Sequence, residues 1–529
     1  MLDGSTDQTK SLARLQPTGT LMAAKPNILF IVLDTQRRDR LSLYGHQRDT
    51  SPQLDAFAQD ATIFERAIAP AQWTIPAHGS LFTGLYPGAH QLQQAHQALP
   101  HEHITLAEHL QAAGYHTTAF CNNPMVGLLE TGLQRGFHHF FNYAGASPNR
   151  PVDMRRSGPR KAVATQFRKL ARKVTNQFAH NDMMFKLSLN PLVVPIWSRM
   201  VNYKGNTERS IDDLIDYLGT ERAGSSQKPL FTFLNLMGTH TPYRPPQDVV
   251  ERIAPSIKHD KHAWRFITEH NADAGAWISP ADPPLADWQR DTLSTFYDAE
   301  IMDQDVHLGR LFAYLEASGA LDDTVVIIAA DHGEGHGDHD FVGHSFVVYQ
   351  ELVHVPLMIH YPERFPAKRI PTNVSTRRIY HTILEMAGLY PDSDVEALSL
   401  TRSLNGVPDP EGGVAFSEAF PPDNLLTILD ERMPGIVTNR KLTQVRRGVY
   451  DGDHKLAMVG DDVENLFHVA SDPSEVSDVA EEKPDLAETL RQRVSQFVDD
   501  ASKEKAKATY NGGVSKEMMD NLRALGYIE

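Results

Sequence analysis

The chain has 529 residues, 41% of them hydrophobic and 8% aromatic, which is enough for a large core and for two domains. Its formal net charge of -16 argues against general nucleic-acid binding, and its single cysteine, Cys121, excludes an intramolecular disulfide. It has no apolar run of about 18 residues, and residues 1–24 read as a flexible leader without the apolar centre of a secretory signal. We therefore expect a cytoplasmic protein without a membrane span, and make no prediction of oligomeric state.

Strands and helices alternate along the first 400 residues. Apolar runs of strand length predict buried parallel strands, and apolar residues three and four positions apart predict helices. The expected strands lie within 27–34, 103–121, 229–240, 324–331 and 354–362, and the expected helices within 49–61, 103–121 and 294–323. This order predicts an α/β fold with a mostly parallel central sheet sandwiched by helices.

Three polar residues follow predicted strands directly. They are Asp34, His240 and Asp331. The carboxyl ends of parallel strands meet at one edge of a sheet, and ligands of such folds bind there. A lone His240 would more often be structural, but the three together predict a site at this edge.

The pattern of predicted strands and helices changes near residue 400. We expect an α/β domain at 25–400, with an insertion at about 145–205. The rest, 401–529, contains a predicted strand pair, a Pro-bearing loop and a helix. It is expected to form a smaller α+β subdomain with a tail.

Residues 154–173 carry eight basic residues and no acidic one. Their apolar residues fall on one helical face, and the apolar segment 190–201 is suited to pack against it. A solvated surface helix is one interpretation. A lid over an anionic substrate and a contact of 155–201 with a membrane surface are the alternatives.

The segment "ADHGEGHGDHDFVGH" (330–344) has the composition of a metal site. Asp331 and His332 end a predicted strand, and three more histidines, His336, His339 and His344, follow among glycines that allow close approach. Carboxylate and imidazole ligands suit Zn²⁺ or Mn²⁺. The alternative is a polar loop with incidental histidines.

The segment "WTIPAHGSLFTGLYP" (73–87) predicts a short helix that Pro76 opens and Gly84 closes. Thr74 stands at or just before its N-cap. Spacing alone favours a helix cap, worth about 1 kcal/mol. The other interpretation is a nucleophile on a helix N-terminus, where the helix dipole and free N–H groups attract an anion. A metal bound to the Thr74 oxygen would lower its pKa and make the alkoxide accessible.

These segments together resemble the sulfatase family of the alkaline-phosphatase-like superfamily. The resemblance is carried by "PNILFIVLDTQRRDRLSLYGH", "TSPQLDAFAQDATIFERAIAPAQWTIPAHGSLFTGLYPGAH", "LMGTHTPY", the stretch through "IIAADHGE", "ELVHVPLMIHYP", "ENLFHVASDPSEVSDVAEEKP" and "LRALGYI". It covers about 26–490 and the tail, apart from the basic insertion.

The departures from the family pattern concern the reacting residues. Typical sulfatases carry Cys-x-Pro-Ser-Arg, whose Cys or Ser becomes formylglycine, whereas this frame reads Thr74-Ile75-Pro76-Ala77-His78. Thr35 replaces the second Asp of the usual pair, and His332 replaces an Asn. These changes resemble the Thr-nucleophile members of the superfamily, which include phosphodiesterases and phospho-group transferases.

The resemblance implies a metal-dependent hydrolase of small anionic sulfate or phosphate esters. One divalent cation (Ca, Mn, Zn or Mg) would be held by Asp34, Thr74, Asp331 and His332. Thr74 would be the nucleophile, assisted by the catalytic residues His78, His240 and His344; the last two are also candidates for a second metal site.

Three alternatives remain open at this point. A phosphodiesterase or phosphonate hydrolase, or a phospho-group transferase, would use the same site. A non-catalytic binding protein would keep the fold alone.

Overall fold

The computed structural model describes residues 25–144, 203–223, 228–277, 280–404, 406–407 and 409–511. The expected leader at 1–24, the basic segment 154–173 and nearly all of the 145–205 insertion lie outside the described residues. None of the helices in the described ranges is long and apolar enough to cross a membrane.

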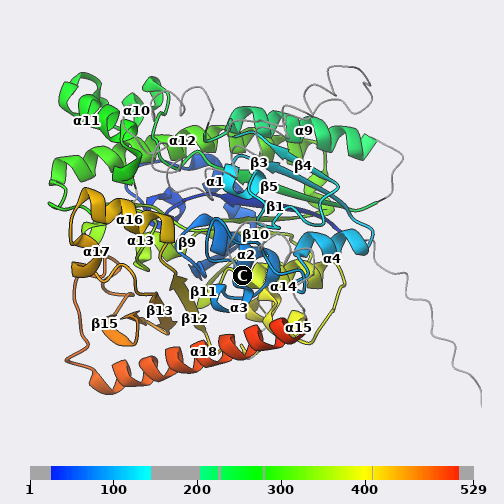
Figure 1. The fold of residues 1–529 in the computed structure, drawn as a ribbon. Helices are drawn as coiled ribbons and strands as arrows, with labels where there is room; N and C mark the ends of the chain where they lie inside the picture. The colour runs from blue at the N-terminus through cyan, green and yellow to red at the C-terminus, as the bar shows by residue number, and fades with distance from the viewer. Residues whose placement is uncertain are drawn as a thin grey trace, which may run out of the picture.

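A nine-stranded sheet runs through the centre of the molecule (Figure 1). Its order is β11-β2-β10-β6-β1-β5-β3-β4, with β9 paired to β2. Strands β6, β1, β5, β3 and β4 are parallel, whereas β10 is antiparallel to both of its neighbours. The strands are β1 (Asn27–Leu33), β2 (Thr62–Ile68), β3 (His116–Cys121), β4 (His139–Asn142), β5 (Leu230–Leu236), β6 (Thr324–Ala329), β9 (His354–Val355), β10 (Leu357–His360) and β11 (Lys368–Ser375). The expected mostly parallel sheet is confirmed.

Strand β1 shows why the central strands are apolar throughout. Phe30 and Val32 belong to the hydrophobic cluster on one face of the sheet, while Leu29, Ile31 and Leu33 belong to the cluster on the other. Because side chains alternate between faces, a strand covered on both sides is apolar at every position.

Helices cover both faces of this sheet (Figure 1). Helices α1, α9, α10, α11 and α12 contribute to one cluster, and α2, α4, α5 and α14 to the other. The helices are α1 (Pro52–Phe57), α2 (Thr74–Thr83), α3 (Pro87–His90), α4 (Leu106–Ala112), α5 (Pro124–Gly127), α9 (Thr207–Ala223), α10 (Gln247–Ile253), α11 (Lys261–Ala272), α12 (Asp287–Ala317), α13 (Gln350–Val353), α14 (Arg378–Met386), α15 (Asp394–Leu398), α16 (Asp423–Arg432), α17 (Ile436–Asn439) and α18 (Pro484–Asn511).

A second, antiparallel sheet follows in the C-terminal part, with α18 lying along it (Figure 1). Leu490 and Val494 of α18 pack in one cluster with Val449 and Leu456 of the sheet. Four strands form it rather than the expected pair, and a short two-stranded sheet lies in the loop after β6. These strands are β12 (Val414–Ala419), β13 (Arg446–Asp451), β14 (His454–Val459), β15 (Asp462–Phe467), β7 (Gly335–His336) and β8 (Val342–Gly343).

Two predicted elements differ in detail. The single strand expected within 354–362 is divided by Pro356 into β9 and β10, since proline has no N–H for the ladder. The helix expected within 49–61 is limited to α1 and one 3-10 turn.

Candidate functional site

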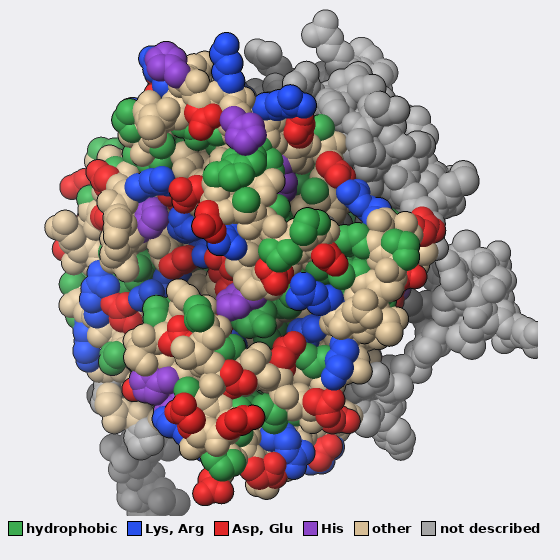
Figure 2. Space-filling view, turned by 90° about the vertical axis from the view of Figure 1, so that its left-hand side faces the viewer, with side chains coloured by type: hydrophobic (Ala, Val, Ile, Leu, Met, Phe, Trp, Pro, Cys, Tyr) green, Lys and Arg blue, Asp and Glu red, His purple; other side chains and the backbone are tan. Residues whose placement is uncertain are grey.

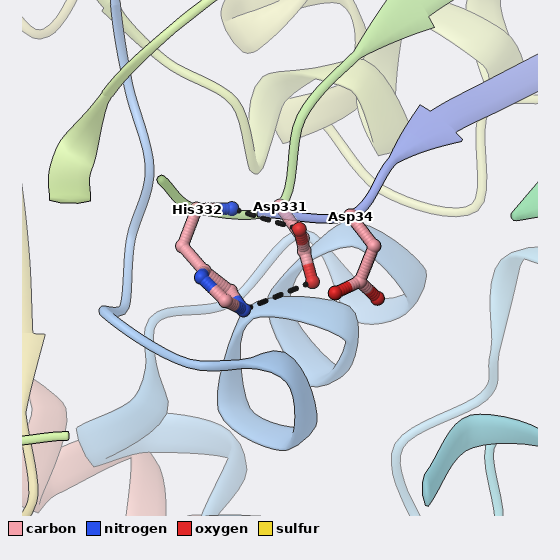
Figure 3. Close-up of side chains that lie close together, drawn as sticks. All are labelled: Asp34, Asp331 and His332. Atoms are coloured by element: carbon pink, nitrogen blue, oxygen red, sulfur yellow. Dashed lines mark hydrogen bonds and ion pairs between the residues drawn. The ribbon is translucent and has the colours of Figure 1, made fainter. Parts of the chain in front are cut away.

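The β1–β6 pairing places Asp34 beside Asp331. Val32 is paired with Ala329, and each aspartate lies two residues beyond its member of that pair. His332 follows directly. One ligand atom from each of these three buried side chains lies within 4.8 Å of the others, and the side chains point toward one another (Figure 3). The predicted edge site is therefore assembled by strand register.

Each carboxylate in this cluster has one oxygen held by donors. Asp34 Oδ2 accepts hydrogen bonds from Asn123 Nδ2 at 2.6 Å and Asn235 Nδ2 at 3.3 Å. Asp331 Oδ1 accepts from the backbone N–H groups of Thr35 at 3.2 Å and His332 at 2.9 Å. The other two oxygens, Asp34 Oδ1 and Asp331 Oδ2, are buried without a hydrogen-bond partner. Buried acceptors in this state fit a cation.

The His332 ring is oriented as a metal ligand. Its Nδ1 lies 2.9 Å from the carbonyl oxygen of Gly333, an acceptor, so Nδ1 carries the proton. Nε2 then presents a lone pair 3.4 Å from Asp331 Oδ2 and 3.3 Å from Thr74 Oγ1. In metal sites, a hydrogen bond from the ring nitrogen that does not bind the metal fixes the tautomer of a ligating histidine, and the Nδ1 bond to Gly333 is of this kind.

Burial controls the ionisation of the cluster. It raises the pKa of Asp34 to about 8, with the Asp331 charge adding to the effect, and burial also raises the pKa of Asp331 to about 7. Burial lowers the pKa of His332 to about 4, which keeps the imidazole neutral. Two carboxylates that resist ionisation beside a neutral histidine lack a positive charge, which a divalent cation would supply. The donor set fits Zn²⁺ or Mn²⁺.

Thr74 is the first residue of α2, whose N-cap is Trp73 without a side-chain capping bond. The capping role that spacing alone favours is therefore absent. Thr74 Oγ1 lies 3.3 Å from His332 Nε2 and 3.4 Å from Asn123 Nδ2, in a side chain that is 1% exposed. Its hydroxyl faces the carboxylate–imidazole cluster, as the nucleophile hypothesis requires.

His78 lies one turn further along α2 and is fully buried. Its Nδ1 is 2.9 Å from the Thr74 carbonyl oxygen and 3.5 Å from Asp331 Oδ2, while its Nε2 is 3.3 Å from Asn235 Nδ2. Burial lowers the pKa of His78 to about 3. Because both ring nitrogens have protein partners, His78 holds the start of α2 against Asp331 and Asn235.

His240 and His344 complete the group of predicted residues. Their ring centroids are 5.1 Å apart, and that of His344 is 4.5 Å from that of His332. His240 Nδ1 lies 2.6 Å from the Thr241 carbonyl, and His344 Nδ1 lies 2.7 Å from Glu334 Oε1. Each ring therefore keeps its Nε2 for another partner.

The described residues contain one other three-donor group: His339, Glu351 and Glu475. Lys455 Nζ lies 2.6 Å from Glu475 Oε1, and the Gln350 N–H donates to Glu475 Oε2 at 2.7 Å. Both oxygens of Glu475 thus have donors, and this group is an ion-pair network. Neither three-donor group includes His240 or His344.

Sequence reasoning missed three residues of the site: Asn123, Asn235 and Glu334. Asn123 follows β3 and Asn235 lies near the end of β5, the two parallel strands beyond β1. The rule that identified Asp34, applied to every strand end, would have found both. Glu334 lies inside the metal-site segment and contacts His344.

Figure 2 views the side of the molecule on which α10, α11, α16 and α17 lie in Figure 1. Acidic, basic and histidine side chains are interspersed over this face (Figure 2).

Comparison with known proteins adds to this geometry. A curated relative, the ulvan-active sulfatase of Formosa agariphila, is 24% identical over 73% of this chain, which spans 66% of that protein. A crystal structure of phosphonate monoester hydrolase from Agrobacterium radiobacter superposes with a TM-score of 0.61 at 20% identity, covering 90% of this chain and 96% of that one. A protein solved with its substrate D-glucosamine-2-N,6-O-disulfate gives a TM-score of 0.62 at 16% identity, covering 91% and 98%.

The family model described as Sulfatase matches residues 26–389, well over half of the chain. That range begins at β1, ends just after α14, and includes every residue of the cluster around Thr74. Sulfatases are hydrolases that typically bind a divalent metal. By the matched range and by its fold, this chain belongs to the sulfatase family.

Proposed function

We propose that the protein hydrolyses small anionic esters, sulfate esters first among them, with Thr74 as the nucleophile. One observation carries the proposal: the buried Thr74 hydroxyl makes no cap but faces His332 at 3.3 Å. The name of the ulvan-active relative and the disulfated substrate of the structural neighbour support the sulfate ester.

Asp34, Asp331 and His332 would hold a divalent cation, with the Thr74 oxygen as a further ligand. A cation bound there supplies positive charge that offsets the charge on the ester and favours the alkoxide form of Thr74. The chain contributes the fixed ligands, because donors on the far oxygen of each carboxylate hold its orientation.

In the first step, Thr74 Oγ forms a bond to sulfur while the bond from sulfur to the leaving oxygen breaks. Thr74 opens α2, whose N-terminus has no side-chain cap, so the helix dipole favours an anionic group bound at Thr74. The leaving oxygen takes up the proton that the Thr74 hydroxyl loses, and the ring nitrogens of His240 and His344 relay it. Glu334, bonded to His344 Nδ1, stabilises the imidazolium form of that ring.

In the second step, water attacks the sulfur of the Thr74 ester and the bond to Thr74 Oγ breaks; the Thr74 oxygen takes up the proton that the water loses, and sulfate is released. A threonine has one hydroxyl and no aldehyde hydrate, so release requires this second displacement. We assign His78 a positioning role, because its two ring nitrogens are engaged by Thr74 and Asn235.

A second candidate is hydrolysis of phosphonate monoesters or phosphodiesters. The superposition with phosphonate monoester hydrolase favours it. In-line displacement by threonine serves phosphorus and sulfur alike, so the same residues would act in the same roles.

The test compares Thr74→Ala, Thr74→Ser and the control Thr83→Ala on a panel of aryl sulfate, phosphate monoester, phosphodiester and phosphonate substrates. Thr83 ends the same helix and donates to the Gly79 carbonyl. Thr83→Ala therefore removes the same hydroxyl and methyl groups from the same helix, but at a position away from the site. Thr74→Ala should lower kcat at least about a thousandfold, whereas Thr74→Ser keeps part of the activity. All three variants should melt within a few degrees of the parent.

A slow substrate should add one sulfuryl or phosphoryl group to Thr74, detected by mass spectrometry of the intact protein and its peptides. Near-parental turnover by Thr74→Ala would show that the hydroxyl is not the nucleophile. The panel itself decides between sulfate and phosphorus esters.

A further inference from the structure

Arg37 is a buried arginine that joins the loop after β1 to the loop after β6. It follows Asp34 by three residues and is 4% exposed. Its Nη1 donates to the Glu334 carbonyl at 3.1 Å and to Asp338 Oδ2 at 2.9 Å. Its Nε and Nη2 donate to the two carboxylate oxygens of Asp39, at 3.0 Å and 2.8 Å. These four contacts use the planar fork of the guanidinium, which the single ammonium of a lysine cannot reproduce.

The position of Arg37 is fixed by its backbone as well. The Arg37 N–H donates to Tyr297 Oη at 2.7 Å, and the Tyr297 hydroxyl donates to the Thr35 carbonyl at 2.6 Å. Tyr297 lies in α12 and is fully buried. The guanidinium is therefore a fixed point, against which the loop after β6 is held.

The backbone around Glu334 is held from two sides. Arg37 binds the Glu334 carbonyl, and the preceding Gly333 N–H donates to the Leu352 carbonyl of α13 at 2.7 Å. A Cβ on Gly333 would clash with another carbonyl oxygen of α13 and would lie 3.3 Å from Arg37 Cγ, so glycine is required there. The Glu334 side chain leaves this fixed backbone toward His344, with Oε1 2.7 Å from Nδ1.

We propose that Arg37 is a positioning residue for the proton relay through His344. The inference rests on the proposed function, in which His344 passes a proton toward the leaving oxygen. Arg37 holds the backbone of Glu334, and Glu334 orients the ring of His344. Among the described residues, Arg37 forms no hydrogen bond or ion pair with Thr74 or with the three proposed metal ligands. Its substitution should therefore affect the relay more than the nucleophile.

The basicity of the leaving group distinguishes an effect on the relay from a general loss of structure. A 4-nitrophenolate is a weak base and leaves with little help from a proton, whereas phenolate is a stronger base and depends on proton transfer. A residue that acts on the relay changes turnover of a phenyl ester more than that of a 4-nitrophenyl ester. A residue that only stabilises the fold changes both alike.

The experiment compares Arg37→Met with the parent on phenyl sulfate and 4-nitrophenyl sulfate, or on the matching phosphonate esters if these are the substrates, in metal-saturated protein. The kcat for the phenyl ester should fall at least about tenfold more than that for the 4-nitrophenyl ester. Glu334→Gln should change the ratio of the two kcat values in the same direction. The double variant should not exceed the larger single effect, because both changes act through one contact to His344.

Arg38→Met is the matched control. Arg38 is the next residue, is also partly buried, and pairs with Glu65 at 2.6 Å. Its loss should leave the ratio of the two kcat values within about twofold of the parent.

Asp338→Asn replaces Arg37→Met if that variant does not fold, because it keeps the shape of the side chain and weakens the contact with Arg37. It should change the same ratio by about threefold or more. The proposal is overturned if the variant lowers kcat for both esters alike or for neither, or if the effects of Arg37→Met and Glu334→Gln multiply. Failure of the proposed function is a separate result, turnover by Thr74→Ala, whatever the ratio of the two esters.

Discussion

At the scale of single residues, the candidate site depends on carboxylate oxygens that have no hydrogen-bond partner. Asp34 Oδ1 and Asp331 Oδ2 are buried without a hydrogen-bond partner, and the neutral Nε2 of His332 lies 3.4 Å from Asp331 Oδ2. Asp331→Asn removes one negative ligand and puts an amide in its place. The protein should lose most of its bound metal, and turnover should fall by orders of magnitude.

Metal content by mass spectrometry and turnover of the same preparation check this expectation. Asp340→Asn is the matched control, since Asp340 lies nine residues away with φ 61°, a conformation that Asn also adopts. Full metal content and full activity in Asp331→Asn would show that this cluster is not the metal site.

Asn123 connects Asp34, the proposed metal ligand, to Thr74, the proposed nucleophile. Its Oδ1 accepts from the Met125 N–H at 2.8 Å, which directs Nδ2 to Asp34 and Thr74. Asn123→Ala should weaken metal affinity about 10- to 100-fold, the usual effect of losing a partner that orients a ligand. It should lower kcat as well.

Asn122→Ala is the control, because the neighbouring amide donates to Ser210 and not to the site. Metal titration and melting temperature separate the two roles of Asn123. A variant that melts early but binds metal like the parent would make Asn123 only the cap of α5.

At the scale of elements, a buried ion pair joins the C-terminal sheet to the loop after β8. Lys455 of β14 contacts Glu475 at 2.6 Å and the Val348 carbonyl, and both charged side chains are fully buried. Lys455→Met leaves the buried Glu475 carboxylate without its counter-charge and should lower the free energy of unfolding by about 3–5 kcal/mol. The double change Lys455→Met with Glu475→Gln should recover much of it.

Urea unfolding measures this effect. Lys441→Met is the control, since the exposed Lys441–Asp462 pair is worth about 0–1 kcal/mol at most. Equal losses of unfolding free energy in the two lysine variants would show that the buried pair stabilises the fold no more than the exposed pair does.

At the scale of the whole molecule, buried neutral histidines away from the site make stability depend on pH. Burial lowers the pKa of His90 to about 3, of His270 to about 4 and of His354 to about 3, from 6.5. Below pH 6.5 the unfolded chain binds protons that the folded chain excludes. Stability is therefore full above pH 6.5 and is lost as the pH falls toward the folded-state pKa. Between pH 7.5 and 5.5 each histidine should cost about 1.4 kcal/mol.

His270 allows this pH dependence to be tested, because its Nε2 is buried without a hydrogen-bond partner. His270→Phe should reduce the loss of stability between pH 7.5 and 5.5 by about 1.4 kcal/mol, the contribution of one histidine. Its Tm should therefore fall less than that of the parent over this range. His259→Gln, at an exposed position, should leave the slope unchanged. An unchanged slope in His270→Phe would show that other groups control acid unfolding.

The sequence by itself determined the central α/β sheet and most of the site. Continuous apolar runs are a property of strands covered on both faces, and a polar residue at the end of such a run marks the binding edge. Asp34, Asp331 and His332 could be read in this way. Strand β2 could not be predicted, because Glu65 and Arg66 interrupt its apolar pattern and their charges find partners only in the folded chain.

Only the tertiary structure decided how the site residues are used. Thr35 adopts φ 59°, which is unusual for a β-branched residue and which presents its N–H to Asp331. His78 resembles a catalytic residue in sequence, but both of its ring nitrogens are engaged by protein groups. The Thr74 hydroxyl faces His332 rather than the N–H groups of its own helix. Local spacing sets where a residue stands along the chain, whereas hydrogen bonds between distant segments set where its side chain points and what it can do.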